Sequence, residues 1–245
     1  MGNRTEAPSA PPSMSEQPNE RRRVVVLGAT GAVGSRAVFT LEAMPDVSAV
    51  TLLGRRPLEG VTSEGVTQHR IDAFDPASYR ALLQDHDAAI CTFGVGQPSK
   101  SPKDEFVRVD KTAVLAFAEA CREQEVGHFE LLGSVGADAG SPSFYLRTKG
   151  ELEDGLRAIG FRRLSLFRPS MILTPTNRYG FSQALTLAIW PRLKPILAGS
   201  LRKYRGVEVE RLGRAIALNL RGNTLGVEVL HWDQIEEVAD RPVAG

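Results

Sequence analysis

The 245-residue sequence predicts an α/β fold, a doubly wound parallel sheet in one domain. Three observations lead to this prediction. Short apolar runs rich in β-branched residues recur along the chain. Segments with helical periodicity separate these runs, so strands and helices alternate. The first run, residues 24–27, ends at a glycine-rich segment that opens a helix.

The elements follow in order along the chain. Pro45 ends the first helix, and Pro76 suits the first turn of the second. The expected strands are residues 24–27, 48–53, 66–71, 87–93, 128–132, 161–167 and 224–230. The expected helices are residues 32–44, 76–84, 104–124, 144–159, 179–198 and 208–221. In such a sheet, ligands bind beyond the carboxyl ends of the strands, where the strand order reverses.

The composition narrows the class of protein. A formal net charge of +1 gives no reason to expect nucleic acid as a partner, and the basic run of residues 21–23 is better explained as a solvated strand edge than as a nucleic-acid patch. Two cysteines without C-x-x-C spacing indicate a reducing, cytoplasmic compartment, and four scattered histidines predict no metal site. The apolar stretch 184–197 is broken by Pro191 and Pro195, so stable membrane insertion is not expected.

The domain is expected to cover residues 21–245, after a disordered tail of residues 1–20 rich in proline and serine. Substrate-side elements are expected mainly in residues 171–205, as a small C-terminal extension. The predicted partner is a small-molecule substrate, and the predicted assembly is a monomer or a homodimer.

A G-x-x-G-x-x-G segment follows the first strand directly. Glycines there allow a tight turn and a close backbone approach to a pyrophosphate, whose charge the helix N-terminus favours. A glycine-rich turn without a ligand is the alternative, but the strand before and the helix after favour a Rossmann-type dinucleotide site. The residues expected at the phosphates are Gly28, Thr30, Gly31, Ala32, Val33 and Gly34.

The end of the second strand predicts which dinucleotide is bound. Proteins that bind NAD usually carry an acid there for the ribose 2′-hydroxyl, but this chain has Arg55 and Arg56. Guanidinium groups can bind a 2′-phosphate, so NADP(H) is favoured over NAD(H) unless both are merely exposed loop charges. Asp72 and Ala73 after the third strand, and Gly94 after the fourth, are expected along the cofactor, although ordinary strand-end turns would explain them equally well.

Tyr145 and Lys149 form a Y-x-x-x-K on a predicted helix, which places phenol and ammonium on one face, one turn apart. A nearby cation lowers the pKa of a tyrosine towards a value useful for proton transfer. Ser134, at the end of the fifth strand, could polarise a carbonyl beside that tyrosine. The alternative is a half-buried core aromatic and a solvated lysine, which the agreement in order and position disfavours.

These motifs resemble the short-chain dehydrogenase/reductases, and the glycine loop and Phe167-Arg168-Pro169 resemble their extended and atypical branches. More narrowly, the segments 52–56, 106–110, 133–138 and 145–151 are similar to the atypical Tat-interacting-protein oxidoreductases, over about residues 23–237. The resemblance implies that Tyr145 is the general acid or base and that Lys149 holds the nicotinamide ribose. It also implies that Ser134 positions the substrate carbonyl and that backbone after Pro169, around Ser170 and Met171, faces the nicotinamide amide.

One position departs from the superfamily pattern. Members often carry an asparagine on the fourth helix that supports a proton-relay water, and alignment puts Arg108 in its place. A buried cation there would change the relay. From the set Ser134, Tyr145 and Lys149, the leading hypothesis is an NADP(H)-dependent carbonyl reductase or alcohol dehydrogenase. The alternative, motivated by Arg108, is a dinucleotide-binding regulatory protein with little or no catalysis. Four aromatic side chains predict an apolar lid or pocket wall, or equally an oligomer contact or plain core: Tyr179, Phe181, Trp190 and Tyr204.

Overall fold

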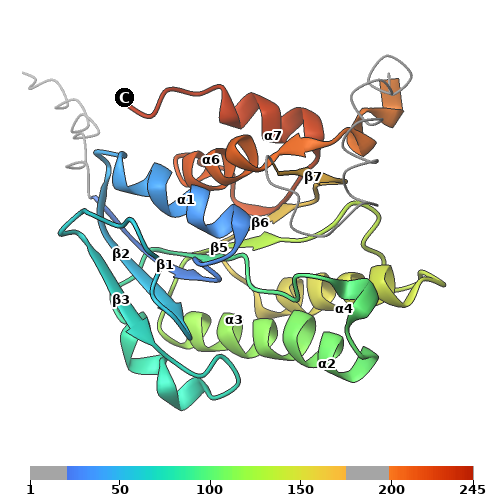
Figure 1. The fold of residues 1–245 in the computed structure, drawn as a ribbon, viewed down its shortest axis with the longest axis horizontal. Coiled ribbons are helices and arrows are strands. Elements are labelled where there is room, and N and C mark those ends of the chain that lie inside the picture. Colours follow the sequence, from blue (N-terminus) through green and yellow to red (C-terminus); the bar gives the residue numbers. More distant parts are fainter. Residues whose placement is uncertain (1–20, 175–198, 245) are drawn as a thin grey trace, which may run out of the picture.

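Seven parallel strands form the central sheet of the computed structural model, which describes residues 21–174 and 199–244 (Figure 1). The strand order is β3-β2-β1-β4-β5-β6-β9. The predicted tail of residues 1–20, the predicted helix 179–198, and Tyr179, Phe181 and Trp190 lie outside the described residues. The strands are β1 (Arg22–Leu27), β2 (Val47–Gly54), β3 (Val66–Arg70), β4 (Ala88–Cys91), β5 (His128–Leu132), β6 (Arg163–Phe167) and β9 (Gly226–Leu230).

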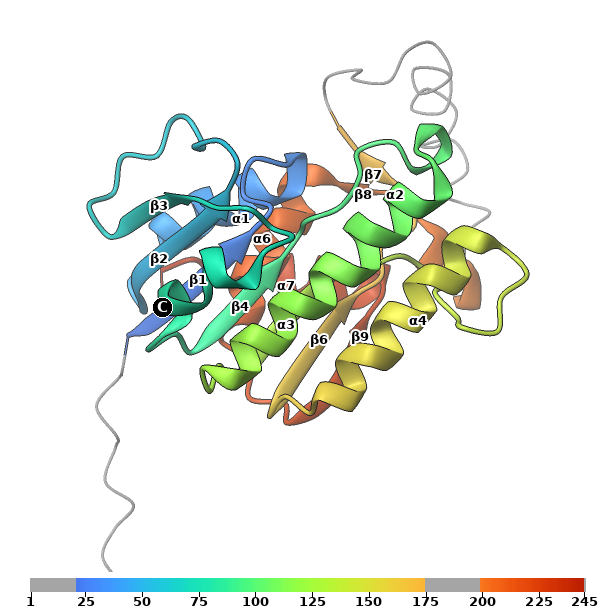
Figure 2. The same cartoon turned by 90° about the horizontal axis from the view of Figure 1, so that it is seen from below.

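Helices cover both faces of this sheet (Figures 1 and 2). One layer holds α1 (Ala32–Glu42), α6 (Val209–Asn219) and α7 (Trp232–Ala239). The other holds α2 (Lys103–Val107), α3 (Ala113–Glu123) and α4 (Phe144–Ile159). β7 (Ile172–Leu173) pairs with β8 (Val207–Glu208) in a second, small sheet. A short 3₁₀ segment, Gly199–Tyr204, precedes β8. The doubly wound parallel architecture predicted from the alternation of strands and helices is confirmed.

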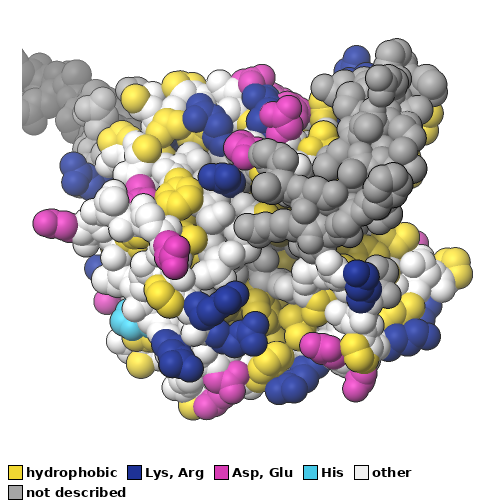
Figure 3. Space-filling model, in the orientation of Figure 1, with side chains coloured by type: hydrophobic (Ala, Val, Ile, Leu, Met, Phe, Trp, Pro, Cys, Tyr) yellow, Lys and Arg dark blue, Asp and Glu magenta, His cyan; other side chains and the backbone are white. Residues whose placement is uncertain are grey.

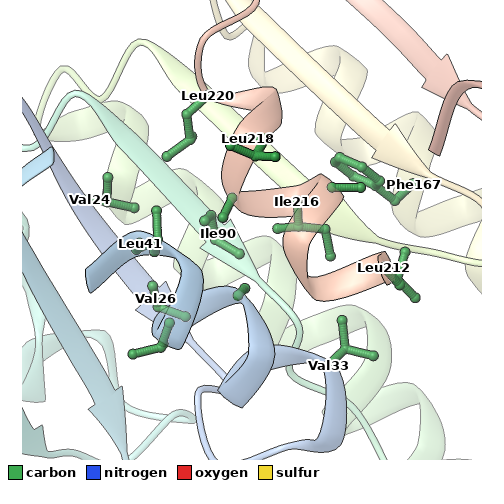
Figure 4. Close-up of a cluster of buried hydrophobic side chains, with 14 of the residues drawn as sticks. Val24, Val26, Val33, Leu41, Ile90, Phe167, Leu212, Ile216, Leu218 and Leu220 are labelled. Carbon is green, nitrogen blue, oxygen red and sulfur yellow. The ribbon is translucent and has the colours of Figure 1, made fainter. Parts of the chain in front are cut away.

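The apolar strands are explained by burial on both faces. Val24 and Val26 of β1 face the α1/α6 layer, whereas Val25 and Leu27 face the α3/α4 layer. A strand covered on both sides has no polar face, which is why its sequence shows an unbroken apolar run. Figure 4 shows the first of these two clusters, in which α1 and α6 pack over β1, β4 and β6.

Two predicted helices differ from the structure. Residues 76–84 form two 3₁₀ turns, Pro76–Ser78 and Arg80–Leu83, instead of one α-helix. Tyr79 separates them because its backbone leaves the helical region (φ −136°) while its buried ring packs edge-on against Phe117. The packing of Tyr79 therefore overrides the local helical pattern.

The predicted long helix 104–124 contains a π-helical turn, Arg108–Thr112, between α2 and α3. Ala113 N donates to Arg108 O, five residues earlier, instead of four. The turn contains the buried Asp110, which belongs to the site described below. Among the described residues, no helix is long and apolar enough to cross a bilayer.

Candidate functional site

The strand order reverses between β1 and β4, and the glycine loop lies at this point. Gly28 has φ +97°, a conformation that side chains rarely adopt. Its carbonyl accepts hydrogen bonds from Gly31 N at 3.0 Å and from the Thr92 hydroxyl at 3.1 Å. A Cβ on Gly28 would lie 2.6 Å from Phe93 N, and one on Gly34 would lie 2.3 Å from Gly28 O. The close packing of loop, helix and β4 therefore explains the first and third glycines.

The middle glycine differs from the other two. Gly31 is exposed at the N-cap of α1. Among the described residues beyond its two chain neighbours, only Gly28 O comes within 4 Å of an added Cβ, at 3.2 Å. No side chain caps the helix there, so backbone N–H groups of the first turn remain available to an anion. The space in front of Gly31 is therefore open to a ligand. Thr30 and Gly31 are exposed around it, whereas Val33 packs into the core.

A pocket of about 180 Å³ lies between this loop and the ends of β2 and β3. Arg56 and Arg70 line it, but Arg55 does not. None of the ion pairs formed among the described residues includes Arg55, Arg56 or Arg70. The remaining lining residues are Ala29, Thr30, Leu52, Leu53, Gly54, Pro57, Leu58, Gln68 and His69. Figure 3 shows Lys and Arg side chains gathered near the ends of β2 and β3.

Sequence reasoning missed Arg70. The visible signal was its place at the last position of β3, beside the end of β2, since parallel neighbours end at the same edge of a sheet. Gly54 pairs in register with Arg70, so the two strand ends lie side by side. Both pocket arginines are exposed, which leaves their guanidinium groups free to meet an anion from solvent.

The segment after β3 contacts a third exposed cation, Arg108 of the π-helical turn. Asp72 is exposed, and its Oδ1 accepts a hydrogen bond from Phe74 N at 2.9 Å, while Ala73 is buried. The Arg108 guanidinium lies over the Phe74 ring, 3.9 Å from its centroid. The buried cation considered for position 108 is therefore absent, because Arg108 is exposed and its guanidinium stacks on the Phe74 ring.

Lys149 is buried on α4, and its Nζ donates to Asp110 Oδ1 at 2.7 Å. Asp110 Oδ2 accepts from Val95 N at 2.8 Å. A Cβ on Gly94 would lie 2.9 Å from Asp110 Oδ1, so this glycine makes room for the carboxylate. Asp110 was missed by the sequence analysis. The signal was its spacing of four from Phe106, which puts an acid on the inward face of a helix.

Tyr145 lies one turn before Lys149 on α4 and is half-buried, with its ring centroid 5.5 Å from that of Phe106. Ser134 follows β5, and its hydroxyl donates to Val135 O at 3.3 Å. Val135 N donates to Pro169 O at 2.9 Å, which brings the Ser134 segment beside the segment after β6. Within the part of the chain that is described, no hydrogen bond joins Ser134 to Tyr145.

A second buried charged residue of α4, Glu153, fixes the inner face of this helix to the sheet. Glu153 is fully buried one turn beyond Lys149, and Arg168 donates to both of its carboxylate oxygens, with Nε–Oε1 at 2.9 Å. Arg168 precedes the buried Pro169 directly. This bidentate pair sets where α4 lies against the end of β6, and so helps to fix the two turns that carry Tyr145 and Lys149.

Comparison with known proteins gives a family and a set of relatives. Residues 28–163 match the family model described as NAD(P)H-binding. The rat protein HTATIP2 is 37% identical over 156 residues, which cover 63% of this chain and 64% of that protein. The chain therefore spans just under two thirds of that relative's length. Protein FMP52, mitochondrial, of Candida albicans is 29% identical over 192 residues, covering 73% of this chain and 83% of that protein.

Solved structures share the fold at low identity. MoeE5, in complex with UDP-glucose and NAD, superposes with a TM-score of 0.64 at 19% identity, covering 91% of this chain and 84% of that one. The UDP-glucose 4-epimerase of Thermus thermophilus, in complex with NAD, has a TM-score of 0.64 at 18% identity, covering 89% and 81%. These likenesses concern the Rossmann-like architecture alone.

Proposed function

The chain belongs to the family of NAD(P)H-binding proteins, and from this premise we propose that it is an NADP(H)-dependent oxidoreductase of the short-chain dehydrogenase/reductase type. Its reaction transfers hydride to or from a small carbonyl or alcohol substrate. One observation carries the proposal: Tyr145 and Lys149 occupy successive turns of α4, and Lys149 is tied through Asp110 to the loop after β4, whose Thr92 contacts Gly28. A protein that only binds a dinucleotide needs no such pair.

The roles of the side chains follow from their chemistry. The bound dinucleotide supplies the hydride chemistry, and the protein supplies orientation and protons. Tyr145 gives its hydroxyl proton to the substrate oxygen in reduction and takes it back in oxidation. Lys149 holds positive charge beside that hydroxyl, and Ser134 donates a hydrogen bond to the substrate carbonyl.

The preference for NADP(H) is supported by the pocket at the ends of β2 and β3. Arg56 and Arg70 line it without a carboxylate partner, and no acid occupies the end of β2. A 2′-phosphate carries the charge that two free guanidinium groups bind best. Arg55 remains a candidate from the sequence, although it lies outside the lining.

Calorimetric titration with NADPH and NADH tests this preference. The wild type is expected to bind NADPH at least about tenfold more tightly, or about 1.4 kcal/mol. Arg56→Ala and Arg70→Ala should each reduce the ratio of the two affinities, whereas Arg55→Ala should keep it. Equal affinities in the wild type would contradict the NADP(H) assignment, and a loss confined to Arg55→Ala would move the phosphate to that side chain.

A regulatory dinucleotide-binding protein is the second candidate, and one observation favours it. Lys149 already has a buried carboxylate partner, so its charge is balanced without a substrate or cofactor. Wild-type NADPH oxidation against a panel of aldehydes, ketones and quinones separates the two candidates. Turnover supports the enzyme, whereas tight dinucleotide binding without turnover across the panel supports the regulator.

A further inference from the structure

Asp110 and Lys149 form the most deeply buried lysine pair of the described chain, with side chains 4% and 8% exposed. We propose that Asp110 is a positioning residue, which holds the Lys149 ammonium in place by tying it to the loop after β4. The inference rests on the proposed function, in which Lys149 contacts the cofactor and assists Tyr145. Neither the glycine loop nor the Y-x-x-x-K pattern assigns a role to position 110.

The chemistry of the contacts explains why an acid stands at this position. Both groups that face the carboxylate are donors: Lys149 Nζ at Oδ1 and Val95 N at Oδ2. A carboxylate offers an acceptor to each, whereas an asparagine side chain would turn its NH₂ group towards one of the two donors. One hydrogen bond would then be lost, and a donor would be left buried without a partner.

Asp110 lies within the π-helical turn, on the buried side that it shares with Phe106 and Val114. Gly94 leaves the space that the carboxylate fills. The turn, the glycine and the two donors thus converge on one side chain, and π-helical turns of this kind frequently mark functional sites.

Other groups around the pair leave Asp110 as the partner of Lys149. The Phe106 ring lies 6.0 Å from Nζ, at the limit of a cation–π contact. Cys91 of β4 is buried nearby, and burial raises the pKa of its thiol to about 12, so it stays uncharged. Glu153, one turn along α4, is held by Arg168. The position of the ammonium therefore depends on Asp110 and, through Val95, on the loop after β4.

A double-mutant cycle with NADPH binding as its readout tests the role. Asp110→Asn is expected to raise the Kd for NADPH about tenfold in the native background. In a Lys149→Met background the same substitution should change the Kd less than about twofold, since a positioning residue acts only through the lysine. Turnover should show the same dependence, with kcat falling and the substrate KM unchanged.

Glu151→Gln is the matched control. Lys111 in the π-helical turn and Glu151 on α4 form a second ion pair, at 2.8 Å, that joins the same two elements at the surface. Its loss should leave the Kd for NADPH within about twofold of the wild type. Should Asp110→Asn fail to fold, Asp110→Glu replaces it in the cycle, because it keeps the charge but shifts at least one of the two bonds.

The outcomes are distinct. A Kd that rises in the native background and not with Lys149→Met supports the inference. A lower melting temperature with unchanged Kd and kcat would reduce Asp110 to a structural role, and an equal effect in both backgrounds would show that it acts independently of Lys149. A wild type that binds NADPH without turnover overturns the enzyme proposal but leaves the cycle intact. A wild type that binds no dinucleotide overturns both.

Discussion

The two halves of the site hold their positive charges in opposite ways. At the ends of β2 and β3, Arg56 and Arg70 are exposed and have no carboxylate partner among the described residues. On α4, Lys149 is buried and paired with Asp110. An exposed cation keeps its hydration until an anion arrives, whereas a buried one needs a partner within the fold. The first arrangement suits binding of a phosphate, and the second suits fixing a charge in one place.

Gly31→Val is expected to have the largest effect of the substitutions, a loss of dinucleotide binding. The new side chain would stand in front of the α1 N-terminus, where Gly31 now leaves space. NADPH binding measured by cofactor fluorescence should fall more than about a hundredfold, while circular dichroism should show a folded chain. Gly34→Val is the contrasting variant, because its side chain would collide with Gly28 O and disturb the fold itself. Retained affinity in Gly31→Val would mean that the loop is only a turn.

Tyr145→Phe should remove the turnover proposed above and leave the affinity for NADPH unchanged. Only the hydroxyl is lost, so kcat for NADPH oxidation should fall at least about a hundredfold. The Kd for NADPH should stay within about twofold of the wild type, because the arginine pocket is untouched. Steady-state kinetics with calorimetry on the same samples measures both quantities. Turnover that survives the substitution would remove Tyr145 as the acid while leaving the enzyme proposal standing.

A buried acid on the opposite side of the sheet, Glu130, shows by comparison what a carboxyl group does when it has no cationic partner. Glu130 on β5 lies under α6, where its Oε1 accepts from Asn219 at 2.9 Å and its Oε2 has no hydrogen-bond partner. No Lys or Arg lies within ion-pair distance of it among the described residues. Burial raises the pKa of Glu130 to about 8 and lowers the pKa of His128 beside it to about 3, so their 3.4 Å approach is not an ion pair near neutral pH.

The sign of the resulting pH dependence follows from linkage. The pKa of Glu130 is higher in the folded chain than its usual 4.5, so the free energy of unfolding should fall as pH rises from about 4.5 to about 8. Glu130→Gln removes this loss, and its stability relative to the wild type should increase by about 4 kcal/mol between pH 5 and pH 9. Urea unfolding at both pH values measures it. A constant difference would mean that Glu130 is ionised in the folded protein.

The smallest expected effect is that of salt on the Kd for NADPH, which should depend on the exposed arginines and not on the buried Lys149. Raising the ionic strength from about 50 mM to about 300 mM screens exposed charges, so the Kd for NADPH should rise about threefold. The double variant Arg56→Ala/Arg70→Ala should lose most of this dependence. Asp110→Asn should keep it, because the buried pair is shielded from ions. A salt effect that survives the double variant would place the responsive charges elsewhere.

The fold could be predicted because its signals are local. Runs such as Val24–Val26 show burial on both faces, and a helix follows most strands at the expected position. The two helix predictions that were wrong failed for different reasons. The Tyr79 ring packs against Phe117, which lies 38 residues away in the chain, and a local pattern does not show this contact. The π-helical turn departs from the 3.6-residue period on which the prediction of one long helix rested.

The candidate site was predictable in part for the same reason. Gly31, Tyr145 and Lys149 lie in motifs that can be read along the chain. Arg70 and Asp110 stand in no such motif, and the role of each depends on a partner distant in sequence: Gly54 across the sheet, and Lys149 on another helix. Alignment placed the departure at Arg108, whereas the side chain that faces the lysine is two residues later.

The pocket that contains Arg70 is built on β3, which is the last strand on its side of the sheet and pairs only with β2. Most of its side chains are exposed, so substitutions there disturb little of the packing. The Asp110–Lys149 pair, in contrast, is buried and contacts the loop after the central strand β4. In evolutionary terms, a few substitutions at this sheet edge would suffice to alter the dinucleotide preference proposed above, while the buried Asp110–Lys149 pair stayed unchanged.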